Sequence, residues 1–179
     1  QGSDMTESDS VKHLHSKGIS VAIGHNAENL GDCDFVIRTA AVHDDNPEIA
    51  AARRLGIPVF ERAQAWGAIM QHYENALCIS GTHGKTTTTS MLAWLMEDSG
   101  LNPSFMIGGI ARNLGRGGRF TDSDFSVLEG DEYDTAFFDK RSKFLHYLPE
   151  LVVINNIEFD HADIYNSLEE IKLSFRRLT

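Results

Sequence analysis

The sequence contains only two cysteines, Cys33 and Cys78, and they lie far apart in the chain. Two distant thiols do not form a disulfide framework, and they do not supply the paired ligands of a zinc site. Cys78 falls within an apolar run, so we expect a buried, reduced thiol. The sequence therefore argues against a disulfide-stabilised domain and against a zinc module.

Long apolar runs and positive charge are also scarce. No apolar run approaches the roughly 18 residues that indicate a membrane-spanning helix, and no secretory segment is visible. Lys and Arg total 16 against 26 Asp and Glu, which gives a formal net charge of −10. This balance argues against a nucleic-acid partner and is typical of an acidic cytoplasmic protein.

The sequence has no internal repeat and no low-complexity segment, and no glycine- or proline-rich linker marks a domain boundary. Its 179 residues, 41% of them hydrophobic, suffice for one domain with a real core or for two small ones. We place a boundary near residues 73–75, ahead of the most distinctive motif. The predicted domains are residues 1–74 and 75–179.

Strand-like and helix-like patterns alternate in the first domain. We expect strands at 19–23, 34–38 and 57–60, and helices at 5–18, after Asn46-Pro47, and at 61–72. Strands that alternate with helices at this length indicate parallel βαβ units. The predicted fold class is α/β, with a Rossmann-like open sheet in the first domain.

The second domain continues the alternation. We expect strands at 76–80, 104–107, 124–129 and 151–155, and helices at 86–97 and 168–178. Residues 1–4 read as though a strand had just finished, and the last helix stops without a cap. We therefore expect the sequence to be a fragment of a longer protein.

A glycine loop joins the strand at 76–80 to the helix at 86–97, and its sequence is Gly81-Thr82-His83-Gly84-Lys85-Thr86-Thr87. Glycines let backbone N–H groups turn toward phosphate oxygens, and the helix N-terminus adds partial positive charge. Lys85 would reach the terminal phosphates, and the Thr86 hydroxyl would bind Mg²⁺. The usual loop has four residues between its first Gly and the Gly-Lys pair, whereas this one has two. The alternative is a glycine turn with an exposed lysine.

Two further strand ends are unusually polar. Residues 129–134 contain four carboxylates in Glu129-Gly130-Asp131-Glu132-Tyr133-Asp134, and Asn156, Asp160, His161 and Asp163 follow the strand at 151–155. Parallel sheets bind ligands beyond the carboxyl ends of their strands. If these strands are neighbours, oxygen ligands suited to Mg²⁺ converge beside the glycine loop.

Each of these clusters has a plainer interpretation. The acidic run could be a solvated turn, and His161 could begin a helix or be a satisfied core histidine. The basic stretch at 140–143 could clamp a phosphate or carboxylate, or be a solvated loop.

Three motifs, in this order, resemble those of the Mur ligase family. They are the loop at 81–87, Glu129 at a strand end, and Asn156-Ile157-x-x-Asp160-His161-x-Asp163. The family consists of ATP-dependent amide ligases that build the peptide of bacterial peptidoglycan precursors. The resemblance runs along the whole chain. Residues 1–107 are more similar to the members that add L-alanine to UDP-N-acetylmuramate, and residues 108–179 to those that add recycled murein tripeptide.

The resemblance implies a Rossmann-like UDP-sugar domain followed by part of a P-loop-type central ATPase domain, with ATP and Mg²⁺ as cofactors. It implies that Lys85 stabilises the β- and γ-phosphates and that Thr86 and Glu129 bind Mg²⁺. It makes His161 the ligand of a second Mg²⁺. The whole loop, Gly81, Thr82, His83, Gly84, Lys85, Thr86 and Thr87, would hold the nucleotide.

Other roles follow from the same resemblance. His83 would lie near the muramoyl carboxylate, and Asn156 near the nucleotide or metal. The candidates for holding the UDP group are Ser3, Asp4, Thr39, Ala40, Ala41 and Asn46. The acceptor is L-alanine or murein tripeptide, and the fragment alone is expected to be inactive. The rival functions are another P-loop ATPase and a nucleotide-binding module without turnover.

Overall fold

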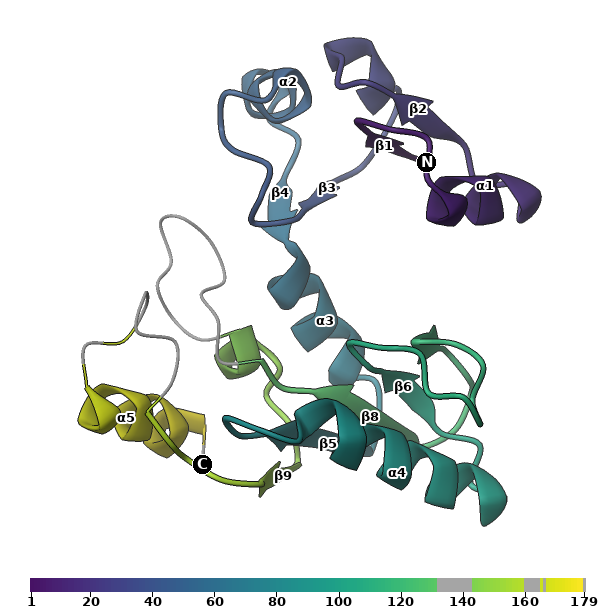
Figure 1. Cartoon of the computed structure of the whole chain (residues 1–179). Coiled ribbons are helices and arrows are strands. Elements are labelled where there is room, and N and C mark those ends of the chain that lie inside the picture. The colour runs from purple at the N-terminus through teal and green to yellow at the C-terminus, as the bar shows by residue number, and fades with distance from the viewer. Residues whose placement is uncertain (132–142, 160–164, 166, 179) are drawn as a thin grey trace. The chain divides into compact units, whose positions relative to one another are not determined.

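The computed structural model describes residues 1–131, 143–159, 165 and 167–178 (Figure 1). The chain divides into two compact units, residues 1–62 and residues 63–179. Both units mix strands with helices, which confirms the predicted α/β class. Within the described part of the chain, no helix has the length and apolar character needed to cross a bilayer.

The first unit follows the predicted alternation. In chain order it contains β1 (Gly2–Asp4), α1 (Asp9–Ser16), β2 (Val21–Ile23), the 3₁₀ turn η1 (Ala27–Leu30), β3 (Val36–Arg38), α2 (Pro47–Leu55) and β4 (Val59–Glu61). The strands pair in parallel, β1 with β2 and β3 with β4, so the described residues form two two-stranded sheets. Pro47 begins α2, in agreement with the helix predicted at Asn46-Pro47, and the Asn46 side chain caps it.

One expectation about the first unit is wrong. Residues 1–4 were expected to follow a finished strand, but Gly2–Asp4 themselves form β1, in register with Val21–Ile23. Glycine, serine and aspartate have weak strand propensity, so the local sequence gives little sign of a strand. Hydrogen bonding to β2 stabilises the extended conformation of these residues.

Packing in the first unit combines a small apolar core with buried charge. Leu30, Ala51 and Ala52 form the centre of the core, so that α2 and η1 pack together. Arg38 and Glu61 are opposite each other on β3 and β4 and form a buried ion pair of 2.7 Å. The Arg38 guanidinium also donates to Asp44 at 2.6 Å. This ion pair links the carboxyl ends of β3 and β4.

The second unit is built on one five-stranded sheet. Its elements are α3 (Arg62–Met70, which begins at the last residue of the first unit), β5 (Asn75–Ser80), α4 (Lys85–Asp98), β6 (Ser104–Met106), β7 (Gly118–Arg119), β8 (Phe125–Glu129), η2 (Lys143–His146), β9 (Leu151–Ile154) and α5 (Leu168–Leu178). The strand order is β7-β6-β8-β5-β9, and every pair is parallel except β6 with β7. The strand β7 and both 3₁₀ turns were not predicted.

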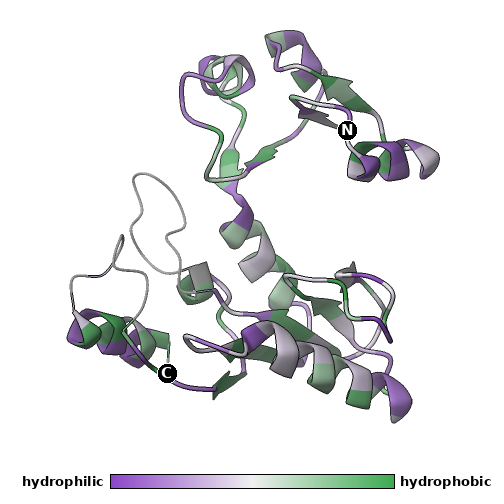
Figure 2. Ribbon diagram, viewed as in Figure 1, coloured by the Kyte–Doolittle hydropathy of each residue, from purple (hydrophilic) through white to green (hydrophobic). Residues whose placement is uncertain are grey.

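Both faces of this sheet are covered. On β5, Ala76 and Cys78 belong to a core that includes residues of α3, η2 and α5, whereas Ile79 belongs to a second core with Ala93 and Met96 of α4. Successive side chains of a strand point to opposite faces, so a doubly covered strand is apolar throughout. The green colour of the central strands in Figure 2 shows this. Cys78 is fully buried and free, as predicted.

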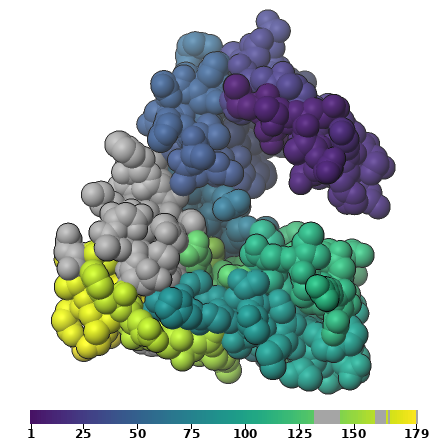
Figure 3. Space-filling view, in the orientation of Figure 1, coloured from purple at the N-terminus to yellow at the C-terminus, as the bar shows by residue number. Residues whose placement is uncertain are grey.

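Some of the large apolar residues of α4 lie outside its buried face. Thr89, Ala93 and Met96 are buried, whereas Met91 and Leu95 are 60% and 58% exposed. The helix α4, in teal, forms part of the surface in Figure 3. The apolar spacing correctly indicated a helix. Its contacts with β5 and β8 bury Met96 and bring Leu92 against the core, but they leave Met91 and Leu95 in solvent.

The helix α3 packs on the second unit. Met70 is buried in its core, and the Trp66 ring stacks on Phe120 with centroids 5.5 Å apart. A β-carbon added at Gly67 would lie 1.9 Å from the His146 carbonyl oxygen, so this helix and η2 are in close contact. The compact units divide directly after Arg62, the first residue of α3, and the domain boundary near residues 73–75 stays a prediction.

Candidate functional site

Three polar strand ends meet at one edge of the second unit's sheet. β5 lies between β8 and β9 and is parallel to both. The carboxyl ends of the three strands therefore lie side by side, which confirms the condition on which the predicted site depends. This edge is where open parallel sheets bind ligands.

The glycine loop turns sharply at this edge. Gly81 has a φ of +131°, and a β-carbon there would lie 3.0 Å from the carbonyl oxygen of Asn156. Gly84 has a φ of +78° and directly precedes α4, where it offers no side-chain cap. Both positions favour glycine because side chains would be strained or crowded there. The loop thus brings bare backbone to the N-terminus of a 14-residue helix, which is the arrangement that binds phosphate.

Lys85 begins α4 and is half-buried beneath the loop. Its Nζ donates hydrogen bonds to the carbonyl oxygens of Gly81 at 2.7 Å and Thr82 at 3.2 Å. The ammonium group is therefore held within the turn of the loop, where an anion bound to the loop would meet it.

Thr86 and Glu129 come together although they are far apart in sequence. The Thr86 hydroxyl donates to one carboxylate oxygen of Glu129 at 2.7 Å, and the backbone N–H of Gly108 donates to the other at 2.7 Å. A hydroxyl and a carboxylate are hard oxygen ligands of the kind that Mg²⁺ prefers. The donor set therefore fits a magnesium ion bound beside the loop. Among the described residues, no group of three or more His, Cys, Asp or Glu side chains is arranged to hold a metal.

The end of β9 holds the other side of the loop. The backbone N–H of Thr82 donates to the Asn156 carbonyl at 3.1 Å, and that of His83 donates to Asn156 Oδ1 at 2.9 Å. The His83 ring projects outward, 58% exposed, and its Nε2 lies 3.8 Å from the Glu158 carboxylate. The structure thus brings His83 and Asn156 together with Lys85, as the sequence predicts; Thr87 is exposed in the first turn of α4.

Several predicted residues lie outside the described residues. They are His161 with Asp160 and Asp163, the acidic residues Glu132 and Asp134, and the basic stretch at 140–142. The second metal ligand therefore stays a prediction.

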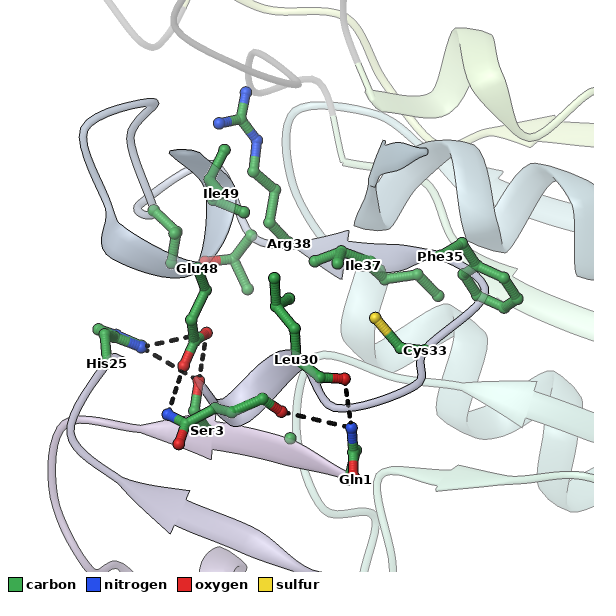
Figure 4. Close-up of a pocket in the computed structure, with 15 residues that line it drawn as sticks. Gln1, Ser3, His25, Leu30, Cys33, Phe35, Ile37, Arg38, Glu48 and Ile49 are labelled. Atoms are coloured by element: carbon green, nitrogen blue, oxygen red, sulfur yellow. Dashed lines mark hydrogen bonds and ion pairs between the residues drawn. The ribbon is translucent and has the colours of Figure 1, made fainter. Parts of the chain in front are cut away.

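The first unit has a cavity of about 250 Å³ that two of the predicted UDP-binding residues line, Ser3 and Thr39 (Figure 4). Asp4, Ala40 and Ala41 are exposed and outside its lining, and Asn46 uses its side chain to cap α2. The structure therefore supports Ser3 and Thr39 as lining residues and gives Asn46 a helix-capping role.

Glu48 is the centre of a hydrogen-bonded cluster in this cavity. Its carboxylate accepts from the Ser3 hydroxyl at 2.7 Å and from the Asn29 amide at 2.6 Å, and His25 Nδ1 lies 3.5 Å away (Figure 4). Burial opposes ionisation, but the hydrogen bonds from Asn29, Ser3 and the Asn26 N–H, with the nearby His25, together hold the Glu48 pKa below its ordinary value. The cavity therefore contains a fixed negative charge.

Sequence reasoning did not select Glu48, His25 or Asn29 as site residues. Glu48 lies in the first turn of α2, where an acidic residue is favoured by the helix dipole alone, so its position carried no functional signal. His25 and Asn29 lie in a loop and a 3₁₀ turn with no recognisable spacing. Asn155 donates from its side chain to the His83 carbonyl oxygen at 3.2 Å and was also not predicted, although a polar residue directly after a buried strand was a usable signal.

Comparison with known proteins agrees with this geometry. Residues 1–74 match the model described as Mur ligase family, catalytic domain, and residues 79–179, more than half of the chain, match that of the Mur ligase middle domain. The chain is 42% identical over 177 residues to a UDP-N-acetylmuramate–L-alanine ligase of Caldicellulosiruptor saccharolyticus, covering 99% of this chain and 37% of that protein. It thus spans just over a third of the length of such relatives.

Solved structures agree as well. The UDP-N-acetylmuramate:L-alanyl-γ-D-glutamyl-meso-diaminopimelate ligase of Neisseria meningitidis matches 99% of this chain with 58% of its own, at a TM-score of 0.88 and 40% identity. The UDP-N-acetylmuramate–alanine ligase of Thermotoga maritima matches 99% of this chain with 40% of its own, at a TM-score of 0.82 and 32% identity. On these matches, the chain belongs to the Mur ligase family.

Proposed function

We propose that this chain is the UDP-sugar-binding and ATP-binding part of an amide ligase that acts on UDP-N-acetylmuramate. The observation that carries the proposal is the junction of Thr86 and Glu129, 2.7 Å apart, beside a phosphate loop at the meeting point of three strand ends. The relatives that support it are ligases of UDP-N-acetylmuramate. We propose peptidoglycan precursor synthesis or recycling in the cytoplasm as its setting.

The proposed reaction has two steps. The muramoyl carboxylate attacks the γ-phosphorus of ATP, which releases ADP and forms an acyl phosphate. The acceptor amine then attacks the acyl carbon, loses a proton, and expels phosphate as the amide bond forms. Phosphoryl transfer of this kind depends mainly on positioning and on neutralising charge.

The described residues have distinct roles in this proposal. The loop backbone and Lys85 bind the β- and γ-phosphates, and Thr86 with Glu129 would hold Mg²⁺, which supplies charge neutralisation. His83 lies at the exposed side of the loop, where the muramoyl carboxylate would approach. In the first unit, the cavity lined by Ser3 and Thr39 would hold part of the UDP group.

The acceptor is either L-alanine or murein tripeptide. Relatives named for each acceptor have nearly the same identity to this chain, 42% and 40%. The full-length parent protein should therefore be assayed with UDP-N-acetylmuramate, Mg²⁺, ATP and each acceptor in turn, following phosphate release and product mass.

We expect phosphate release that requires both UDP-N-acetylmuramate and one acceptor. ATP hydrolysis without UDP-N-acetylmuramate would instead indicate a nucleotide hydrolase. Nucleotide binding without product from either acceptor would indicate a binding module.

A further inference from the structure

Asn155 lies directly after β9 and reaches the phosphate loop with its side chain. Its Nδ2 donates to the His83 carbonyl oxygen at 3.2 Å and to the Thr88 hydroxyl at 3.1 Å. Its backbone N–H donates to Ser80 at the end of β5, at 2.9 Å. Asn155 thus connects the end of β5, the middle of the loop and the first turn of α4.

Asn155 and Asn156 together, here called the asparagine pair, hold both sides of His83. The His83 carbonyl can only accept, so Asn155 must present its NH₂ group, and the His83 N–H can only donate, so Asn156 must present its oxygen. The two amides therefore have fixed and opposite orientations. Gly84 leaves the space that this requires, since a β-carbon there would lie 3.3 Å from Asn155 Nδ2.

We propose that Asn155 is a positioning residue that sets the phosphate loop in its nucleotide-binding conformation before the nucleotide arrives. A loop with glycines at positive φ has many accessible conformations, and ordering it on binding would reduce affinity. Asn155 fixes the turn at residues 83–84 through the His83 carbonyl and fixes its distance from α4 through Thr88. The inference rests on the proposed function, because the proposed function is what makes the loop a nucleotide-binding site.

The test measures affinity and loop order separately. The chain and its variants Asn155→Ala, Asn155→Asp and Thr88→Val are titrated with a non-hydrolysable ATP analogue and Mg²⁺ by calorimetry. Hydrogen exchange of amides 81–88 is measured without nucleotide. Ser99→Ala is the matched control, because that hydroxyl bonds within the far end of α4, to Leu95 at 2.7 Å.

Asn155→Ala should weaken binding about tenfold and speed exchange in the loop, because it removes two hydrogen bonds that order it. Asn155→Asp should weaken binding further, since it keeps the size of the side chain but places a negative charge beside the phosphates. Thr88→Val should weaken binding about threefold. In a double variant with Asn155→Ala it should cause little further loss, because both changes remove the same contact between Asn155 and Thr88. Ser99→Ala should resemble the wild type in both measurements.

The relative losses of affinity among the variants distinguish a positioning role of Asn155 from a merely structural one. Unchanged affinity and exchange in Asn155→Ala would overturn the inference. So would equal losses in Asn155→Ala and Asn155→Asp with faster exchange throughout the sheet. If the wild type binds no analogue while Asn155→Ala still speeds loop exchange, the ordering of the loop by Asn155 stands and the proposed function fails.

Discussion

The glycine loop of the second unit and the cavity of the first unit are built in different ways. The loop is seven consecutive residues, and backbone groups of Thr82 and His83 anchor it to the end of β9. The cavity depends on side chains from separate segments that converge on the Glu48 carboxylate. A site made of contiguous backbone leaves a spacing pattern in the sequence, whereas a site made of dispersed side chains does not.

The two regions should also respond differently to substitution, one in ligand binding and the other in stability. Lys85 and Thr86 lie at the exposed edge of a sheet whose core is formed by other residues. Glu48 is 14% exposed and fully engaged in holding its neighbours. Substitution in the loop should therefore change ligand chemistry, and substitution in the cluster should change the stability of the first unit.

The largest effect is expected for Lys85→Ala in the full-length parent protein. Acyl phosphate formation should fall about 10³-fold, because a charge aimed at the transferring phosphate is lost. Binding of UDP-N-acetylmuramate should be nearly unchanged, since Lys85 is not among the residues that line the first unit's cavity. The measurements are turnover and calorimetric titration of the UDP-sugar; near-normal turnover would show that Lys85 does not act on the transferred phosphate.

Gly67→Ala should destabilise the second unit by about 3 kcal/mol, because the new methyl group would meet the His146 carbonyl. Alanine normally stabilises a helix relative to glycine, so the sign of the change identifies packing. Urea unfolding measures the effect, and Gly2→Ala, whose added methyl meets open space, is the control. A more stable Gly67→Ala variant would contradict the packing of α3 on η2.

Glu48→Ala should destabilise the first unit by about 2 kcal/mol, because it leaves the donors around the carboxylate unpaired. The Glu48 pKa is below its ordinary value of 4.5 in the folded chain. Its contribution is therefore fully present above pH 4.5 and is lost as the pH falls through the folded pKa. Unfolding followed between pH 6 and 3 should show this loss in the wild type and not in Glu48→Gln; identical pH profiles would be the contrary result.

The smallest effect concerns the two thiols. Burial raises the pKa of Cys78 to about 12, whereas Cys33 is half-buried and lines the first unit's cavity. In the native chain Cys33 should react with a thiol reagent at least about tenfold faster than Cys78, because the thiolate is the reactive form. Mass spectrometry of the labelled chain measures both rates, with the unfolded chain as the control. Equal native rates would show that the sheet core opens readily.

Much of the fold could be predicted because its signals are local. The run at 76–80, the glycine loop and the helix after it follow one another in sequence, and the structure places them as β5, the loop and α4. The proline after Asn46 likewise marks the beginning of α2. These elements need no distant partner to be recognised.

The rest depends on contacts that sequence spacing does not contain. β1 forms because β2 pairs with Gly2–Asp4, and the buried face of α4 is selected by β5 and β8. Glu48 becomes the centre of a cluster only when Ser3 and Asn29 fold toward it. The sequence predicted that Thr86 and Glu129 come together only if their strands are neighbours. The sheet order shows that the strands β5 and β8 are neighbours.

We propose that the second unit binds Mg²⁺ and nucleotide at the glycine loop and that Glu129 takes part in this binding. The most direct test is a titration of the chain with Mg²⁺ and a non-hydrolysable ATP analogue, following backbone amide resonances. We expect saturable shifts at residues 81–88, at Gly108 and at Glu129, with an affinity that depends on Mg²⁺ and that Glu129→Gln reduces. Saturable shifts confined to the first unit, or a response that Glu129→Gln leaves unchanged, would contradict it.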